Sequence, residues 1–387
     1  MARRVLLLGS TGSIGRQSLA VLADLGASHR VVGLSAARSA ALLSRQARTF
    51  AVEQVCLTDA GARGELDLPS GCRLHTGAEG LLALVGATEP DLVICAISGA
   101  AGLPSTLAAA RAGATLALAN KESMVLAGHL VKAAVAASGG RVIPVDSEHS
   151  AIAQCLAGQP RSALRRLVLT ASGGPFRGKC RAELADVTPS QALRHPCWDM
   201  GPRITVDSAT LMNKALEIIE ACQLFDVTPE QVEVVVHPQS VIHSMVEFVD
   251  GAVLAQLSPP DMRLPIRYAL GYPDRLPDGG KPVDFAALSG LTFEAPDRAA
   301  FPCLALGERA ARAGGLAGTI MNAADEVAVE AFLAGRLPFL SIADVVADAL
   351  DRFDAKSQPD LDEILETDRR VRAHAASRLP QPAARSG

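Results

Sequence analysis

The feature that most constrains the fold of this chain is a series of short, unbroken apolar segments within its first 145 residues. Stretches rich in Ala and Leu, typical of helices, separate these segments. Apolar strands without alternation are typical of a parallel sheet covered on both faces. The predicted strands are Arg4–Leu8, Val31–Leu34, Gln54–Leu57, Leu92–Ala96, Thr115–Leu118 and Arg141–Val145. We therefore predict an α/β fold whose N-terminal domain is doubly wound (Rossmann-like).

A glycine-rich turn directly follows the first predicted strand. Gly9, Gly12 and Gly15 are spaced G-x-x-G-x-x-G, which departs from the usual G-x-G-x-x-G of dinucleotide-binding turns. Free backbone N–H groups at the start of the next helix would favour a pyrophosphate. An ordinary tight turn of small residues is the alternative. The position between an apolar strand and a helix favours dinucleotide binding.

The end of the second predicted strand indicates which dinucleotide is bound. An NAD site normally carries Asp or Glu there to bind the ribose hydroxyls. Residues 35–39 contain no acid but contain Arg38, whose charge suits a 2′-phosphate. We therefore predict NADP(H) rather than NAD(H), with a solvated surface arginine as the alternative.

Two carboxylates follow the last predicted parallel strand. Asp146 and Glu148 stand where open α/β sheets usually place ligand-binding groups. In an extended chain, side chains two residues apart project to the same side. The alternative is that Asp146 or Ser147 only caps the following helix.

A third carboxylate lies on a helix predicted over residues 207–225, with Asp207 or Ser208 as its N-cap. Asn213, Lys214 and Glu217 fall on one face of this helix, opposite an apolar flank. A routine exposed Lys214–Glu217 pair is the alternative. Three carboxylates without thiolate ligands indicate oxygen ligation, and hence Mg²⁺ or Mn²⁺ rather than zinc.

Between these clusters lie groups suited to an anionic substrate. An apolar strand ends at Ser172 in a Ser-Gly-Gly turn, which offers hydroxyl and backbone donors. Residues 194–202 contain the only tryptophan, Trp198, among Pro, Asp and Gly, so we predict a mobile lid. A hairpin is predicted to turn at 250–251. His237 and His243, before and at its start, carry little weight alone.

Composition excludes several classes of protein. The 387 residues have a net charge of −4 and scattered basic residues, which give no reason to expect nucleic acid or an anionic membrane as a partner. We find no apolar run of the roughly 18 residues that a membrane span needs. The eight cysteines form no Cys-x-x-Cys pair, so we expect reduced, buried thiols in a cytoplasmic protein.

Taken together, these segments resemble the 1-deoxy-D-xylulose 5-phosphate reductoisomerase family over nearly the whole chain. The resemblance is specific because several long motifs occur in the right order. They are GSTGSIG at 9–15, ALANKES at 117–123, VDSEHSAI at 145–152, SGGPF at 172–176, HPxWxMG at 195–201, VDSATLMNKALE at 206–217, HPQSVIHS at 237–244 and NAADE at 322–326.

The resemblance implies an NADPH- and metal-dependent oxidoreductase of isoprenoid biosynthesis. The family converts 1-deoxy-D-xylulose 5-phosphate to 2-C-methyl-D-erythritol 4-phosphate by rearranging the carbon skeleton and reducing the resulting aldehyde with NADPH. The resemblance also implies a homodimer and a metal that is Mg²⁺ or Mn²⁺, with Co²⁺ as a further candidate.

Roles are implied residue by residue. The metal ligands are Asp146, Glu148 and Glu217. The substrate contacts are Ser147, Ser172, His195, Trp198, Met200, Ser208, Asn213 and Lys214. The catalytic residues are Lys214, His149, His195 and His243. The NADPH contacts are Gly9, Thr11, Gly12, Ser13, Ile14, Arg38, Asn120, Lys121, Glu122 and Gly201.

Three residues depart from common family choices. Cys197 and Asp199 stand in the loop where Asn and Ser are often found, and Asp325 replaces a common Asn. Two other interpretations remain open on the residues alone. A homoserine- or inositol-dehydrogenase-like enzyme would share the nucleotide domain, and a non-catalytic NADP sensor would not need intact metal ligands.

We predict four segments along the chain. They are an NADPH-binding domain at 1–146, a central α+β catalytic domain at 147–271, a linker arm at 272–297 and a C-terminal helical domain at 298–387. Helical patterns are visible at 304–312, 322–334 and 342–353, and the tail after Arg378 is expected to fray.

Overall fold

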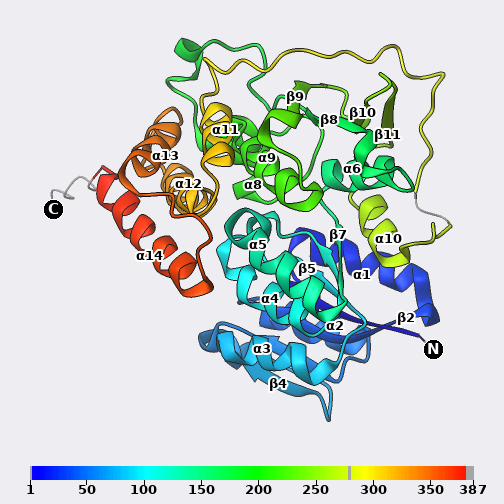
Figure 1. Ribbon diagram of the computed structural model, residues 1–387. Coiled ribbons are helices and arrows are strands. Elements are labelled where there is room, and N and C mark those ends of the chain that lie inside the picture. Colours follow the sequence, from blue (N-terminus) through cyan, green and yellow to red (C-terminus); the bar gives the residue numbers. More distant parts are fainter. Residues whose placement is uncertain (1, 278–279, 381–387) are drawn as a thin grey trace. The chain divides into compact units, whose positions relative to one another are not determined.

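The computed structural model describes residues 2–277 and 280–380 (Figure 1). The chain folds into two compact units whose segments alternate along the sequence. The first unit comprises 1–123, 129–153 and 261–282, and the second comprises 124–128, 154–260 and 283–387. Most of the tail that we expected to fray lies outside the described residues. The four-segment division stays a prediction.

The first unit contains a seven-stranded, fully parallel sheet. Its strand order is β4-β3-β2-β1-β5-β6-β7, so β1 is central and the order reverses between β1 and β5. This confirms the predicted doubly wound sheet. The strands are β1 (Arg3–Leu8), β2 (His29–Ala36), β3 (Gln54–Leu57), β4 (Arg73–Thr76), β5 (Leu92–Cys95), β6 (Thr115–Leu118) and β7 (Arg141–Pro144).

The sequence pattern missed β4. This strand pairs only with β3 in the described part of the chain, so it forms the edge of the sheet. Of its four residues only His75 is buried, and the run Arg-Leu-His-Thr contains no apolar segment. An edge strand needs no apolar run on both faces, and the rule that found the central strands therefore does not find it.

Helices connect and cover these strands. Val5, Leu7, Leu34 and Ile94 are fully buried in the core beneath them. A helix from much later in the chain, α10, adds Ile266 and other residues to the same core. The helices are α1 (Ser13–Leu25), α2 (Ala40–Thr49), α3 (Gly77–Thr88), α4 (Leu103–Arg111), α5 (Lys121–Ser138), α6 (Ser147–Leu156) and α10 (Arg263–Gly271), and both α5 and α6 pass from one unit to the other.

The second unit contains a four-stranded sheet of order β11-β10-β8-β9. Strand β10 runs antiparallel to β8 and β11, whereas β8 and β9 are parallel. The predicted hairpin turn is confirmed, with Gly251 at a φ of 85°. The strands are β8 (Leu164–Ala171), β9 (Val232–Val236), β10 (Ile242–Phe248) and β11 (Val253–Leu257).

The single helix predicted over 207–225 is wrong. Two helices, α8 (Pro202–Thr210) and α9 (Met212–Phe225), meet at Leu211, whose φ is 60°. Asp207 and Ser208 therefore lie inside α8 rather than capping a helix. A left-handed leucine costs on the order of 1–2 kcal/mol, which tertiary packing must offset. Local sequence carries no signal for such a break.

In the described residues the C-terminal part contains helices and no strand after Cys303, as predicted. It contains α11 (Cys303–Ala313), α12 (Ala317–Leu333), α13 (Ser341–Arg352) and α14 (Leu361–Arg378), the last of which the sequence pattern did not delineate. Helix α12 packs against α13 and α14 (Figure 1). Helix α11 packs closely on α9, because a Cβ on Gly307 would lie 2.2 Å from the Cβ of Ala215.

Two expectations from composition have different outcomes. All eight cysteines are free, as expected, but only four of them are buried and Cys180 is exposed. Across the described residues, no helix is both long enough and apolar enough to cross a membrane.

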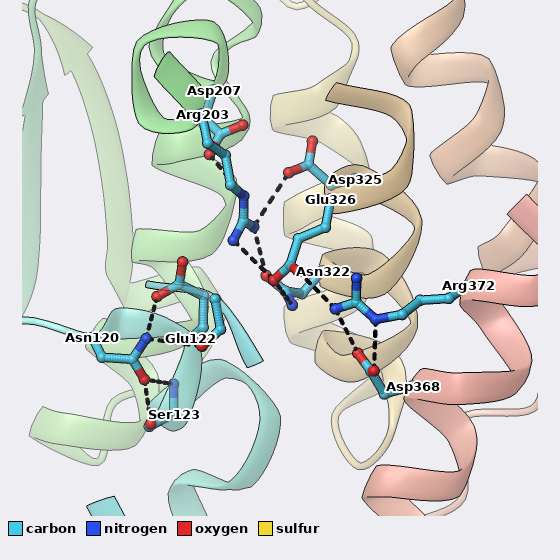
Figure 2. A network of polar contacts seen from close by, with 11 residues as sticks. Asn120, Glu122, Ser123, Arg203, Asp207, Asn322, Asp325, Glu326, Asp368 and Arg372 are labelled. Atoms are coloured by element: carbon cyan, nitrogen blue, oxygen red, sulfur yellow. Dashed lines mark hydrogen bonds and ion pairs between the residues drawn. The ribbon is translucent and has the colours of Figure 1, made fainter. Parts of the chain in front are cut away.

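A partly buried polar network links α8, α12 and α14 (Figure 2). Arg203 of α8 donates to Asn322 (2.8 Å) and Glu326 (2.9 Å) of α12 and lies 3.5 Å from an Asp325 oxygen. Glu326 also accepts from Arg372 of α14 at 2.7 Å. Burial tends to raise the pKa of Glu326, but the charges of Arg203 and Arg372 outweigh it and hold that pKa below its ordinary value.

Asp325 behaves in the opposite way. Its side chain is fully buried, and loss of water raises its pKa to about 6 even though Arg203 opposes the shift; the neighbouring Glu326 raises it further. The folded protein therefore binds more protons than the unfolded chain between about pH 4 and pH 6. Stability from this group is complete below the unfolded pKa and is lost as pH rises through 6.

We predict that Asp325→Asn stabilises the protein at neutral pH. The variant removes a buried charge at the loss of the contacts that the Asp325 carboxylate makes with Arg203 and Asp207. Thermal unfolding should show a higher Tm than the wild type at pH 7.5 and a smaller difference at pH 5. The exposed Asp351→Asn is the control. A Tm difference independent of pH would contradict the assignment.

Candidate active site

The glycine turn after β1 is shaped by two close approaches. A Cβ on Gly9, whose φ is 85°, would lie 2.5 Å from the carbonyl oxygen of Ala96. A Cβ on Gly15 would lie 2.2 Å from the carbonyl oxygen of Gly9. Packing alone therefore requires glycine at both positions.

Gly12 differs from its two neighbours. The nearest atom to a Cβ at this position would be 3.5 Å away, an ordinary contact. Gly12 is the N-cap of α1, and no described side chain bonds to this cap. The missing side chain leaves the N–H groups at the start of α1 accessible to a ligand. This geometry suits a phosphate at the positive end of the helix.

A buried glutamine that the sequence did not reveal holds this turn in place. Gln46 of α2 accepts from the Ser10 hydroxyl at 2.7 Å and donates to the Ser10 carbonyl at 2.9 Å. Thr11, Ser13 and Ile14, which follow Ser10, are thereby presented at the turn and at the first helical positions.

Arg38 lies two residues beyond the end of β2 and is largely exposed. Its Nε donates to Asp59 at 3.0 Å, and its side chain is 84% exposed. Asp59 follows the adjacent strand β3, so an acidic residue lies next to Arg38 although the two are 21 positions apart in the sequence. An exposed pair of this kind contributes little stability, so Arg38 can exchange Asp59 for a ligand phosphate.

The segment after β6 carries the other predicted cofactor residues of this unit. Asn120 caps α5 by accepting from the Ser123 N–H at 3.1 Å, and its amide donates to Glu122 at 2.8 Å (Figure 2). The same amide donates to the Gly99 carbonyl at 3.0 Å. The buried Lys121 forms an ion pair with Asp146. The two residues meet because β6 and β7 are parallel neighbours, whose carboxyl ends share one edge of the sheet.

The predicted carboxylate pair adjoins a helix rather than an extended chain. Asp146 precedes α6, while Ser147 and Glu148 are its first residues, so the premise of an extended Asp146–Glu148 segment is wrong. The Ser147 hydroxyl donates to Glu148 at 2.6 Å. His149 is fully buried, with its Nδ1 3.9 Å from an Asp146 oxygen.

In the second unit, the Ser-Gly-Gly turn and the α8–α9 break enclose a small pocket. A Cβ on Gly174, whose φ is 66°, would lie 2.7 Å from the Ser208 carbonyl oxygen, so the two segments are in close contact. The pocket is lined by Ala171, Ser172, Gly173, Ser208, Leu211, Asn213 and Lys214. It combines two hydroxyls, an amide and an ammonium, which suits a phosphate.

The polar face of α9 is buried, so the alternative of an exposed Lys214–Glu217 pair is excluded. Glu217 is fully buried and Lys214 is 4% exposed. Glu217 accepts from Lys214 and from Asn213, both at 2.6 Å. Such partners offset the loss of water that a buried carboxylate suffers.

His195 links the loop 194–202 to the pocket. Its Nδ1 accepts from the N–H groups of Trp198 (2.9 Å) and Cys197 (3.2 Å), which places the ring proton on Nε2. That N–H then donates to Ser172 Oγ at 2.9 Å. Because Ser172 Oγ also accepts from the Gly174 N–H at 3.2 Å, its own proton is directed to another acceptor, such as a ligand oxygen.

The rest of the loop lies against the strand β10 and the segment before it. The Trp198 ring lies 5.9 Å from that of His243, which donates to the Ser258 carbonyl at 3.1 Å. Cys197, one of the family departures, donates to the Pro238 carbonyl through its thiol. Met200, like Trp198, is partly buried.

Gly201 lies apart from the other predicted cofactor residues along the chain, and His237 is bonded only to backbone groups in the hydrogen bonds described. Gly201 caps α8 in the second unit, whereas the other predicted cofactor residues belong to the first. His237 is fully buried, bonded to the backbone through both ring nitrogens and stacked on Phe293, so its role is structural.

A doubly wound sheet with an open helix start at its first glycine turn is typical of nucleotide-binding proteins, among them the nucleotide-dependent oxidoreductases. Three family models match successive segments. They are 1-deoxy-D-xylulose 5-phosphate reductoisomerase at 5–128, its C-terminal domain at 142–225 and the DXP reductoisomerase C-terminal domain at 257–374. The chain belongs to the 1-deoxy-D-xylulose 5-phosphate reductoisomerase family.

Relatives and solved structures agree with this assignment. The enzymes of that name from Pelotomaculum thermopropionicum and Symbiobacterium thermophilum are 49% and 50% identical, over 96% of this chain and 97% of theirs. The Zymomonas mobilis enzyme in complex with NADPH is 42% identical, with a TM-score of 0.90 over 97% of this chain and 99% of that one. A reductoisomerase with NADPH, fosmidomycin and magnesium is 40% identical, with a TM-score of 0.90 over 97% and 98%.

We predict that Arg38→Ala weakens the binding of NADPH without weakening the binding of NADH. The lost bond to a 2′-phosphate, which NADH lacks, is expected to raise KM for NADPH roughly 10-fold. Steady-state kinetics with both cofactors measures this. Arg30→Ala, which breaks another exposed ion pair on β2, is the control. An equal effect on both cofactors would place Arg38 away from the 2′-phosphate.

Proposed function

We propose that this protein converts 1-deoxy-D-xylulose 5-phosphate to 2-C-methyl-D-erythritol 4-phosphate, using NADPH and a divalent metal. The observation that carries the proposal is the buried Asn213–Lys214–Glu217 face of α9 beside a Ser172–Ser208 anion pocket, in a member of this family. The test is NADPH oxidation with this substrate, with and without metal, and identification of the product. NADPH binding without turnover of this substrate would favour the alternative of a non-catalytic NADP sensor.

The cofactor is assigned to the turn and strand ends of the parallel sheet. Gly12 and the start of α1 hold the pyrophosphate, Arg38 the 2′-phosphate, and Asn120 to Glu122 the nicotinamide half. Thr11, Ser13, Ile14 and Gly201 complete the proposed contacts. When bound, NADPH supplies the hydride that reduces the aldehyde carbon of the rearranged substrate.

The metal is assigned to Asp146, Glu148 and Glu217. These residues offer only carboxylate oxygens, and Asp146 and Glu217 are low in exposure and each is paired with a lysine, so the donors suit a hard cation. Mg²⁺ and Mn²⁺ are the proposed ions, with Co²⁺ as a further candidate. When bound, the metal polarises neighbouring substrate oxygens as a Lewis acid.

The anion pocket holds the substrate phosphate while the carbon skeleton rearranges. Ser172 Oγ accepts from His195 and from the Gly174 N–H, which leaves its own proton for a ligand oxygen, and Ser208, Asn213 and Lys214 supply further polar contacts. Fixing the phosphate keeps the reacting fragments in register. Lys214, His149, His195 and His243 are the proposed catalytic groups, and Ser147 is a further substrate contact.

The loop 194–202 is assigned as a lid that excludes water from the reaction. It contains no helix or strand before α8 begins at Pro202, and His195 holds it to the pocket through Ser172. Trp198 and Met200 are only partly buried, which suits residues that move to cover a ligand. Ligand binding at Ser172 would therefore be transmitted directly to the loop.

The proposed compartment is the cytoplasm. The eight free cysteines support this proposal, and cell fractionation tests it.

The proposed assembly is a homodimer. Strand β11 is the edge of its sheet in the described residues, and Val253, Leu254 and the nearby Val249 are 51%, 42% and 64% exposed. An apolar edge of this kind is usually covered.

We predict a sedimenting species of twice the 40.1 kDa chain mass. Replacing Val253 and Leu254 with Lys should shift the equilibrium towards the monomer, because charges on an edge strand oppose pairing. Analytical ultracentrifugation at micromolar concentration measures both. A wild type that sediments only as a monomer would contradict the proposal.

We predict that Glu217→Gln keeps the fold and NADPH binding but lowers kcat by more than about 100-fold. The change removes a charged metal ligand at constant volume. Replacing a residue that only supports a metal ligand already lowers metal affinity or activity roughly 10–100-fold, so loss of the ligand itself should lower activity more. Calorimetric titration should show weakened Mn²⁺ binding. Glu233→Gln, at an exposed position of β9, is the control. Unchanged Mn²⁺ affinity would show that Glu217 only neutralises Lys214.

A further inference from the structure

Arg203 stands at a position that local helix chemistry disfavours. It is the second residue of α8, directly after the N-cap Gly201 and Pro202, and the first turn contains no acidic residue. A cation there faces the positive end of the helix dipole, which is unfavourable. A residue that breaks a local rule is usually retained for a tertiary or functional reason.

The tertiary reason is visible in its partners. One guanidinium nitrogen donates to Glu326 at 2.9 Å and another to Asn322 at 2.8 Å, while Nε lies 3.7 Å from Asp207 (Figure 2). Asn322 and Glu326 are four residues apart on one face of α12. The planar fork of an arginine spans two such acceptors at once, which a lysine ammonium cannot do with the same geometry.

Glu326 of α12, which accepts from Arg203, is also bonded to helix α14. Arg372 of α14 bonds to Glu326 at 2.7 Å and to Asp368 at 2.7 and 3.0 Å. Helix α12 also packs closely on residues 124–128, because a Cβ on Gly318 would lie 2.3 Å from the Val125 carbonyl oxygen. Arg203 therefore joins the start of α8 to a fixed support.

Both ends of α8 lead to the proposed substrate site. The loop 194–202 enters at its start, and Ser208 near its end lies in the anion pocket against Gly174. A shift of the helix start would displace the point from which the loop leaves and would alter the pocket. Displacements of about 1 Å at such positions can cost roughly 100-fold in rate.

We propose that Arg203 is a positioning residue that fixes the start of α8 on α12, so that the loop 194–202 closes from a fixed point over the anion pocket. This inference rests on the proposed role of the loop as a lid. Arg203 itself touches no substrate; it acts through Gly201 and Ser208. Helices α12 and α14 thereby support the substrate site although they carry none of the assigned site residues.

The test compares Arg203→Met with Arg203→Lys. Met keeps much of the length but removes the charge and the fork, and we expect kcat/KM for the phosphosugar to fall about 10- to 100-fold, with KM for NADPH within about twofold of the wild type. Arg203→Lys keeps the charge without the two-pronged guanidinium, and its kcat/KM should lie between those of the wild type and Arg203→Met. Arg309→Met, which breaks an α11–α13 tether in the same helical domain, should leave both constants unchanged.

A second readout follows the loop directly. Trp198 is the only tryptophan, so its fluorescence reports this segment without interference. In the wild type, fosmidomycin with Mg²⁺ should change the emission and reduce acrylamide quenching. Arg203→Met should weaken that protection, whereas Arg309→Met should not. Should Arg203→Met fail to fold, Asn322→Ala removes one acceptor of the fork without burying an unpaired carboxylate and should show a smaller loss of the same kind.

The outcomes separate the two proposals. If the wild type turns over but Trp198 does not respond to fosmidomycin and Mg²⁺, the lid proposal fails and this inference is overturned with it. If Trp198 responds equally in the wild type and Arg203→Met, with unchanged kcat/KM and only a lower Tm, Arg203 is a stabilising tether and the inference alone is overturned.

Discussion

Parallel pairing of neighbouring strands is the constraint on which the first unit depends. Because β6 and β7 run in the same direction, the residues that follow them meet at one edge, and Lys121 lies against Asp146. The same edge presents the glycine turn after β1 and Arg38 after β2. One geometric rule thus gathers backbone N–H groups, a guanidinium, an ammonium and a carboxylate from segments that are far apart in the chain.

The second unit depends on a backbone break that is unfavourable in isolation. Leu211 in a left-handed conformation turns α9 away from α8, which allows Ser208, Asn213 and Lys214 to line one pocket. Close contacts at Gly174 and Gly307 help to hold α8 and α9 in place. Strain of this kind persists only where surrounding packing over-determines it, and such positions are common at functional sites.

Charge inside the second unit is arranged around arginines. Four carboxylates, Asp207, Asp325, Glu326 and Asp368, share the guanidinium groups of Arg203 and Arg372. Burial of Asp325 away from water, which the charge of Arg203 offsets only in part, raises the pKa of this carboxyl group to about 6. The protein keeps this costly network where the loop 194–202 joins α8, and a role in positioning gives a physical reason for the cost.

Much of the protein was determined by its sequence. Unbroken apolar strands indicated a parallel sheet because both faces are buried, and the spacing of Gly9, Gly12 and Gly15 after the first strand indicated a dinucleotide-binding turn. Ser172 and the α9 face were identified by residue type and spacing, and the ordered motifs indicated the family. These signals are local, so one chain is enough to reveal them.

Tertiary structure alone decided the rest. The edge strand β4 lacks an apolar run, the break at Leu211 needs no special residue, and Asp59 reaches Arg38 only because β2 and β3 are adjacent. The bonds from Arg203 to Asn322 and Glu326 join residues 119 and 123 positions apart. Such contacts depend on how separate elements pack, and the periodicity of any single segment carries no information about its distant neighbours.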